Sequence, residues 1–210
     1  SLKILADYVI ERHYPRCKDG KNSYINLFKE IVKRQAILIS KWMSVGFIHG
    51  VMNTDNTSIY GETIDYGPCA FLDEYDSNKV FSSIDQTGRY AYKNQPEIIR
   101  WNLACLASSL LPLINDDEKK SIILAQNAVD EFPDLYKEEW LKLFRNKLGL
   151  QNKKVLIIGG SKGIGEKISY EFLHQGCNVT LIARNKKLLK KIIFNLNKIK
   201  PGNNYFSINL

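Results

Sequence analysis

The segment that most constrains this chain is residues 46–68, GFIHGVMNTDNTSIYGETIDYGP. It gathers three oxygen-bearing side chains within eleven positions: Asp55, Asn56 and Asp65. Residues 57–64 carry β-formers on both sides of Gly61-Glu62, which predicts a short hairpin with that pair at the turn. Folding the hairpin would bring Asn56 and Asp65 close together. A carboxylate and an amide oxygen suit Mg²⁺, which usually binds one or two carboxylates and the phosphates of a substrate.

The spacing of these residues matches part of the catalytic signature of protein kinases, H-R-D-L-x-x-x-N followed by D-F-G. Residues 49–56, HGVMNTDN, keep the His and the Asn of that signature, and 65–67, DYG, stands in place of D-F-G. Val51 occupies the position of the usual catalytic base, so an ordinary kinase mechanism is not expected. Asp55 is the nearest replacement. The alternative is that Asp55 and Asn56 only form a turn, which both residue types favour.

Five segments resemble the selenoprotein O family of protein adenylyltransferases, also called pseudokinases: HGVMNTDN, TIDYGP, FLDEYD, TGRYAYKNQP and WNLACLA. The resemblance covers about residues 2–150. It implies a kinase-like fold that binds ATP in a flipped pose and transfers AMP to Ser, Thr or Tyr hydroxyls of a protein. It also implies that Asp55 accepts a proton, that Asn56 and Asp65 bind Mg²⁺, and that Asp65 belongs to the ATP site.

The same resemblance places the family's Gly-rich loop, ATP-binding Lys and phosphate-binding Arg residues upstream of the matched segment. We therefore expect the chain to be a fragment in which the adenylyltransferase activity is incomplete. His49 is expected to hold the loop by packing and hydrogen bonds rather than to take part in the chemistry.

The fold expected for residues 1–150 is mainly α, a kinase-like C-terminal lobe with a short catalytic hairpin. Apolar spacing predicts a helix from Leu2 that Pro15 ends, and a long helix from about Tyr24 that Gly46 ends. A strongly apolar helix begins at about Pro96, and two further helices are expected at 117–131 and 134–148. Residues 71–76 and 85–90, which follow Pro68, carry many polar groups and few periodic apolar ones, which predicts loops.

A different pattern begins at about residue 151. An apolar strand at 155–158, the glycine-rich segment GGSKGIG, a helix to about residue 175 and a strand at 178–183 follow one another. This order is the context that a dinucleotide-binding loop requires. A helix at 186–199 and a strand at 204–209 continue the alternation. We therefore predict two domains, 1–150 and a partial α/β Rossmann unit of βαβαβ type at 151–210.

The spacing G-x-x-x-G-x-G, with ARN after the second strand, resembles the short-chain dehydrogenase/reductase family over residues 153–210. The resemblance assigns cofactor binding to Gly159, Ser161, Lys162, Gly163, Ile164 and Gly165. Arg184 replaces the acid that would bind the ribose of NAD, so with Lys162 it favours NADP. The family's catalytic Tyr-x-x-x-Lys pair is not found in residues 153–210, because Tyr170 and Tyr205 lack the Lys four residues on. The rival functions are therefore an NADP-dependent reductase fragment and a non-catalytic remnant of a gene fusion.

Charge, cysteine count and apolar runs limit the classes of partner and the compartment expected for this chain. The net charge is +8, but residues 1–150 carry 19 Lys and Arg against 20 Asp and Glu, whereas 151–210 carry 11 against 2. The lysines of 186–191 lie at helical spacing and indicate a solvated face rather than a nucleic-acid site. Four cysteines without a C-x-x-C pair favour reduced thiols in a cytoplasmic protein. No apolar run approaches the ~18 residues of a membrane span. From the lysine spacing we therefore expect no nucleic acid as a partner, and from the lack of a long apolar run we expect no membrane.

Overall fold

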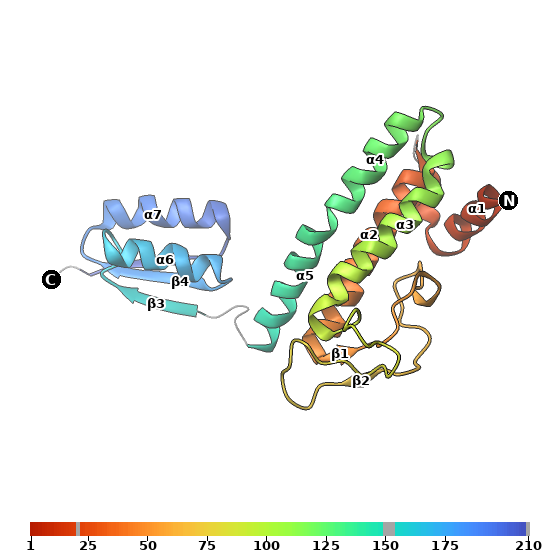
Figure 1. The fold of residues 1–210 in the computed structure, drawn as a ribbon. Coiled ribbons are helices and arrows are strands. Elements are labelled where there is room, and N and C mark those ends of the chain that lie inside the picture. Colours follow the sequence, from red (N-terminus) through yellow and green to blue (C-terminus); the bar gives the residue numbers. More distant parts are fainter. Residues whose placement is uncertain (20–21, 149–153, 209–210) are drawn as a thin grey trace. The chain divides into compact units, whose positions relative to one another are not determined.

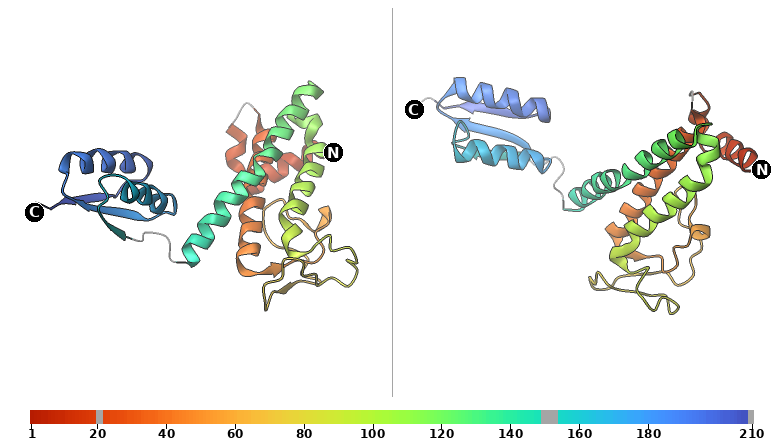
Figure 2. Two further views of the ribbon diagram at one scale, coloured as in Figure 1. Left: turned by 60° about the vertical axis from the view of Figure 1, so that its left-hand side comes forward. Right: turned by 45° about the horizontal axis from the view of Figure 1, so that its top comes forward.

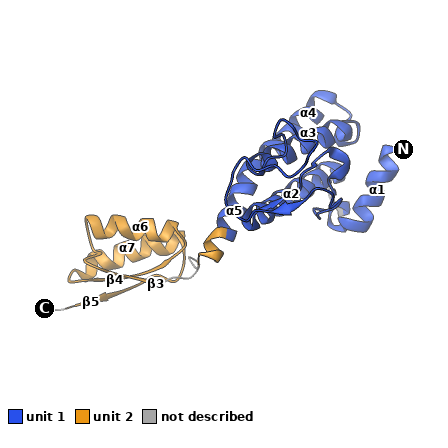
Figure 3. Cartoon of the chain, turned by 60° about the horizontal axis from the view of Figure 1, so that its bottom comes forward, with its two compact units in different colours: residues 1–143 blue, residues 144–210 orange. Residues whose placement is uncertain are grey.

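A computed structural model describes residues 1–19, 22–148 and 154–208. The chain forms two compact units, residues 1–143 and 144–210 (Figure 3). The division falls inside helix α5. The domain boundary expected at residue 150 lies outside the described residues.

Unit 1 is built on helices. They are α1 (Leu2–His13), the short 3₁₀ helix η1 (Pro15–Asp19), α2 (Ser23–Val45), α3 (Gln95–Ile114), α4 (Glu118–Asp130) and α5 (Phe132–Lys147). The five α-helices expected from apolar spacing are confirmed. Gly46 ends α2 in the left-handed conformation, with φ of 72°, and its N–H donates to the carbonyl of Trp42. Glycine reaches this conformation at no steric cost, which explains why α2 stops there.

The core of unit 1 lies between α2, α3 and α4. The ribbons of α2 and α3 lie side by side, and α4 contacts both (Figure 1 and Figure 2). Phe28 and Ile39 of α2 and Ile99 of α3 are almost wholly buried. Burying a side chain of this size stabilises the fold by about 1.5–3 kcal/mol. The packed helix pair therefore forms a rigid base for the loops that follow α2.

One helical stretch, Tyr92–Ile114, is long and apolar enough to cross a membrane by those two measures alone. It comprises the 3₁₀ helix η3 (Tyr92–Asn94) and α3. The sequence analysis expected no stretch of this kind, and that expectation is wrong. One face of α3 packs into the core of unit 1, and the stretch as a whole is only partly buried.

The loop-bearing end of unit 1 contains a small antiparallel sheet. β1 (Phe47–Ile48) pairs with β2 (Ala70–Phe71), with Phe47 opposite Phe71. A 3₁₀ helix, η2 (Thr54–Asn56), lies between the two strands in sequence. Phe71 of β2 falls in a segment that the sequence analysis expected to be loop. The sheet joins the start of the candidate catalytic loop to the segment that follows Asp65.

Unit 2 is a three-stranded parallel sheet with two helices. The strands β3 (Lys154–Ile158), β4 (Asn178–Ala183) and β5 (Asn204–Ser207) lie in the order β3-β4-β5, with Ile157 opposite Leu181. α6 (Ile164–His174) and α7 (Lys186–Ile199) supply the remainder of the core. The predicted βαβαβ alternation is confirmed. Assignment of the unit to the Rossmann fold stays a prediction, because three strands are only half of that fold's sheet.

The alternate residues of this sheet differ in exposure. Ile157, Val179 and Leu181 are buried against the helices, whereas Leu156, Ile158 and Phe206 are 59–79% exposed. Successive side chains of a strand point to opposite faces. The two helices therefore cover one face of the sheet, and the other face is apolar and open within the described residues.

Candidate active site

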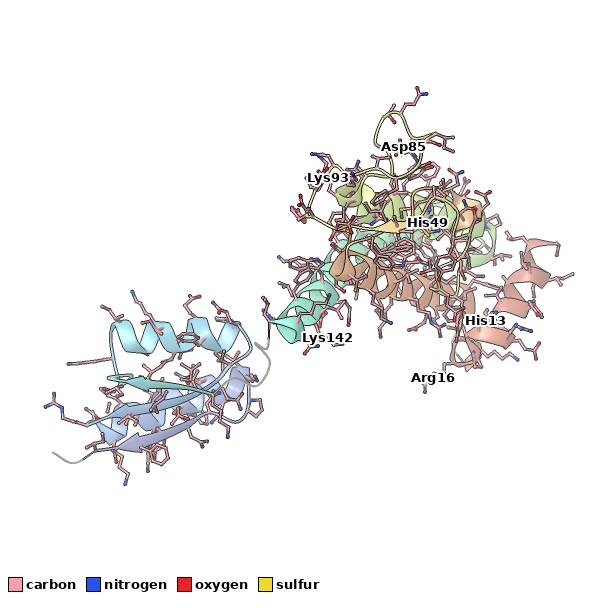
Figure 4. All side chains as sticks on the ribbon, turned by 90° about the horizontal axis from the view of Figure 1, so that it is seen from below. His13, Arg16, His49, Asp85, Lys93 and Lys142 are labelled. Carbon is pink, nitrogen blue, oxygen red and sulfur yellow. The ribbon has the colours of Figure 1, made fainter. Side chains whose placement is uncertain are left out.

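His49 connects the candidate catalytic loop to the segment before Asp65. Its side chain is 1% exposed, and its Nε2 lies 2.7 Å from the carbonyl oxygen of Ile64. Because a carbonyl only accepts, Nε2 carries the proton and donates it. The ring also packs beside Trp42, at 5.4 Å between centroids. Figure 4 shows His49 among the loops at one end of unit 1. These contacts support the structural role expected for this residue.

Asp65 is held in an unusual backbone conformation. Among the described residues it is the one non-glycine residue with positive φ, at 54°. The N–H of Gly67 donates to its carbonyl at 2.8 Å, which closes a tight turn. A left-handed non-glycine residue costs roughly 1–2 kcal/mol, and such strain is concentrated at functional sites. The turn leaves the carboxylate of Asp65 exposed.

Residues 49–51 form a loop that contacts both the segment after Asp65 and the side chain of Asn56. A Cβ atom on Gly50 would come within 2.9 Å of Pro68, so this part of the loop contacts the segment after Asp65. On the other side, Asn56 Nδ2 donates to the carbonyl of Val51 at 3.2 Å. The structure therefore brings the segments that carry Asn56 and Asp65 to the same three-residue loop.

The orientation of the Asn56 amide suits a metal. Its NH₂ group is directed to the carbonyl of Val51, so Oδ1 is the atom left for a cation. Asp65 offers a carboxylate, and Asp55 is exposed on η2 beside Asn56. No group of three or more His, Cys, Asp and Glu side chains suited to a metal occurs in the described ranges. Two protein oxygens fit Mg²⁺, which retains water and substrate phosphates as its other ligands.

The hairpin predicted for residues 57–64 is wrong. The structure has no strand there, and the chain turns at Ser58–Gly61, where Gly61 has φ of 80°. Side chains from α2 and from the residue that follows α1 bind the backbone carbonyls that a strand ladder would need. They are Gln35 Nε2 to Ser58 at 2.5 Å, Tyr14 Oη to Ile59 at 2.6 Å and Arg34 Nη1 to Tyr60 at 3.3 Å. The segment is therefore fixed to α2 rather than folded on itself.

Two buried amides of α3, which the sequence analysis missed, hold the loop. Gln95 Oε1 accepts the His49 N–H at 3.0 Å, and its Nε2 donates to the Phe47 carbonyl at 2.9 Å. Asn102 Nδ2 donates to the Met52 carbonyl at 3.1 Å and to Thr57 Oγ1 at 2.8 Å. A polar residue in a strongly apolar helix is the signal that could have identified them, because a buried polar group needs a partner.

The loop ahead of α3 has a carboxylate that organises its own backbone. Asp85 accepts the N–H groups of Arg89 at 2.9 Å and Tyr90 at 2.8 Å. Burial acts to raise the pKa of Asp85, but these backbone donors outweigh it and lower the pKa below its usual value. Tyr90 in turn donates from its hydroxyl to Asn53 Oδ1 at 2.6 Å. The loop therefore supports the candidate catalytic segment from a second side.

The glycine-rich segment of unit 2 forms a turn between β3 and α6. Gly159 and Gly163 have φ of 83° and 64°, and a Cβ atom on Gly165 would come within 2.6 Å of the Gly159 carbonyl oxygen. A cavity of about 530 Å³ lies beside the turn, and four of the predicted residues line it: Gly159, Ser161, Lys162 and Arg184. Gly163, Ile164 and Gly165 are not among its lining residues. Gly163 is the N-cap of α6, and Ile164 and Gly165 are its first residues.

Comparison with known families identifies the chain. The family model of the protein adenylyltransferase SelO matches residues 1–208. The chain belongs to the SelO family. The resemblance expected for residues 2–150 is thereby confirmed and extends further along the chain. The comparisons give no support to a short-chain dehydrogenase fragment in residues 153–210, nor to NADP as a cofactor.

Curated relatives of the chain are named protein nucleotidyltransferase YdiU. The Anoxybacillus flavithermus protein is 53% identical over 174 residues, which are 83% of this chain and 36% of the relative. The Clostridium beijerinckii protein is 58% identical over 153 residues, 73% of this chain and 31% of the relative. The Clostridium perfringens strain SM101 protein is 48% identical over 202 residues, 95% of this chain and 40% of the relative. The chain thus spans less than half the length of these relatives.

Proposed function

We propose that unit 1 supplies the Mg²⁺-binding part of a protein adenylyltransferase site. The observation that carries the proposal is that Asn56 and the segments on both sides of Asp65 contact residues 49–51, with the NH₂ group of Asn56 directed to Val51 so that its oxygen is left for a cation. Membership of the SelO family supports the same activity. The substrates would be ATP and a protein with a Ser, Thr or Tyr hydroxyl.

Each residue has a separate role in the proposed reaction. The protein hydroxyl attacks the α-phosphorus of ATP, a new oxygen–phosphorus bond forms, and pyrophosphate leaves. Asp55 accepts the proton of the attacking hydroxyl. Asn56 and Asp65 would hold Mg²⁺, which neutralises phosphate charge and orients the leaving group when bound. The turn at Asp65 and the hydrogen bond of His49 to Ile64 constrain the backbone that carries the Asp65 carboxylate.

The test is calorimetric titration of ATP with Mg²⁺ into the purified chain. Asp65→Asn removes a charge with little change of shape, and Asp73→Asn is a matched control at an exposed loop position. Loss of a contact to a charged group costs about 1.5–3 kcal/mol, so we expect Asp65→Asn to weaken binding at least about tenfold. Asp73→Asn should leave the affinity unchanged. Equal affinity in the wild type and in Asp65→Asn would refute the proposal.

We infer as a second function that unit 2 binds the phosphate of a nucleotide. The supporting observation is that Lys162 and Arg184 line one cavity with Gly159 and Ser161, beside the N-terminus of α6. Helix N-termini and nearby cations favour anions. Titration of NADPH and of ATP against the wild type and Gly163→Val tests this inference. Binding of neither nucleotide would exclude it.

The cytoplasmic location of the protein stays a prediction.

A further inference from the structure

A cavity of about 230 Å³ lies beside the candidate catalytic loop, inside unit 1. Its walls come from α2, from α3 and from the segment that contains η2. Four aliphatic side chains line it: Ile31, Ile59, Leu103 and Leu106. Thr54 and Thr57, which flank Asp55 and Asn56 in sequence, line it as well. None of the lining side chains is charged, so the cavity suits a neutral molecule.

Two amides in the wall of this cavity lack a donor for their oxygens. Gln35 and Asn102 are 1% and 5% exposed. Each uses its NH₂ group on a backbone carbonyl, that of Ser58 and that of Met52. A carbonyl cannot donate, so the orientation of each amide is fixed. Within the described residues Gln35 Oε1 and Asn102 Oδ1 have no hydrogen-bond partner, and a buried acceptor without a donor lowers stability.

We propose that this cavity binds a small neutral molecule with an apolar body and an N–H or O–H donor. The apolar body lies against the aliphatic wall, and the donor pairs with the oxygen of Gln35 or Asn102. A cavity of roughly 150 Å³ lined by Leu, Ile and Phe accommodates benzene. The present volume of about 230 Å³ therefore accommodates a ring with one polar substituent.

Binding at this cavity would act on the candidate active site. Asn102 also donates to Thr57 Oγ1 at 2.8 Å, and Thr57 donates to the Asn53 carbonyl at 3.1 Å. These contacts hold the residues on both sides of Asp55 and Asn56. A molecule that bonds to Asn102 therefore changes the affinity of the loop for ATP with Mg²⁺, by about 5- to 150-fold for a typical coupling. This second part rests on the proposed adenylyltransferase function.

The cavity is tested with the probe 4-fluoroaniline, whose binding to the full chain is measured by fluorine NMR. Its matched partner, 4-fluorotoluene, has nearly the same shape but no donor. We expect saturable binding of 4-fluoroaniline and at least about fivefold weaker binding of 4-fluorotoluene, as the loss of one hydrogen bond predicts. Equal affinity for the two probes would overturn the role of the amide oxygens. An absence of saturable 4-fluoroaniline binding would overturn the proposal.

Two neighbouring serines provide the protein controls. Ser108 and Ser109 are both exposed on α3, and each hydroxyl donates to the carbonyl four residues earlier. Ser109 lines the cavity, whereas Ser108 does not. We expect Ser109→Trp to abolish probe binding and Ser108→Trp to retain it. Binding that survives in Ser109→Trp would place the probe elsewhere and overturn the proposal.

A separate titration tests the coupling. ATP with Mg²⁺ is titrated into the wild-type chain with and without saturating 4-fluoroaniline. A changed affinity supports the coupling, and an unchanged affinity overturns it. If ATP with Mg²⁺ does not bind in either case, the proposed function fails, while the fluorine NMR experiment still decides whether the cavity is a binding site.

Discussion

Replacing Gln95 by leucine should destabilise unit 1 severely. Gln95 is wholly buried at the start of α3, and it bonds to the N–H of His49 and the carbonyl of Phe47. Leucine fills a similar volume, so the main cost is two buried backbone groups without partners. Each costs about 1–3 kcal/mol, which gives roughly 2–6 kcal/mol together. A small domain is typically stable by only about 5–15 kcal/mol.

Urea denaturation followed by tryptophan fluorescence measures this loss. The three tryptophans, Trp42, Trp101 and Trp140, all lie in unit 1, so the signal reports on that unit alone. For a slope of about 2 kcal/mol/M, the midpoint should fall by roughly 1–3 M. Gln126→Leu is the matched control, because Gln126 is exposed on α4 and bonds only to the side chain of Asp130 among the described contacts. It should change stability by less than about 0.5 kcal/mol.

The reasoning is refuted if Gln95→Leu loses less than about 1 kcal/mol with an unchanged slope. That result would mean that His49 and Phe47 do not depend on α3. A large loss in Gln126→Leu would instead show that any change of a glutamine in this unit has the same effect.

Three further outcomes are expected. The pKa of Asp85 is lowered in the folded protein, so its contribution to stability is present above the pKa of an unfolded Asp, about 3.9. That contribution is lost as the pH falls through the lower folded value. The amide NMR signal of Tyr90, which donates to Asp85, should therefore shift over that range in the wild type and should not shift in Asp85→Asn. Gly61→Ala should destabilise unit 1 by about 1–2 kcal/mol, because residue 61 has φ of 80° and a Cβ atom would come within 2.8 Å of Arg34 Cβ; a midpoint of tryptophan fluorescence equal to that of wild type would contradict this. Leu196→Ala should cost unit 2 about 2–5 kcal/mol, measured by circular dichroism, while the tryptophan midpoint of unit 1 stays the same because Leu196 packs only within the core of unit 2.

The elements that could be predicted from the sequence are those with a strong local pattern. The apolar spacing of α2 and the glycine at residue 46 defined both the helix and its end. The strands and helices of unit 2 followed from short apolar runs and the glycine-rich turn. In each case the residues that decide the structure are close together in sequence.

The errors concern segments whose partners are distant in sequence. Residues 57–64 carry β-formers, yet their carbonyls bond to Tyr14, Arg34 and Gln35, which no local pattern indicates. The roles of Gln95 and Asn102 likewise depend on loop groups about 50 residues earlier. The candidate residues Asp55, Asn56 and Asp65 were predicted from a known spacing, and their role stays a prediction. The side chains of Gln95 and Asn102, which hold the loop, were missed.

The most direct test of the proposed Mg²⁺ site is paramagnetic broadening by Mn²⁺ bound with ATP. Mn²⁺ prefers the same carboxylate, carbonyl and water ligands as Mg²⁺, and it broadens NMR signals of nearby nuclei. We predict that the signals of Asn56 and Asp65 broaden and that Asp65→Asn abolishes the broadening of the Asn56 signal. Broadening that spares both residues in the wild type would contradict the assignment of the metal to this loop.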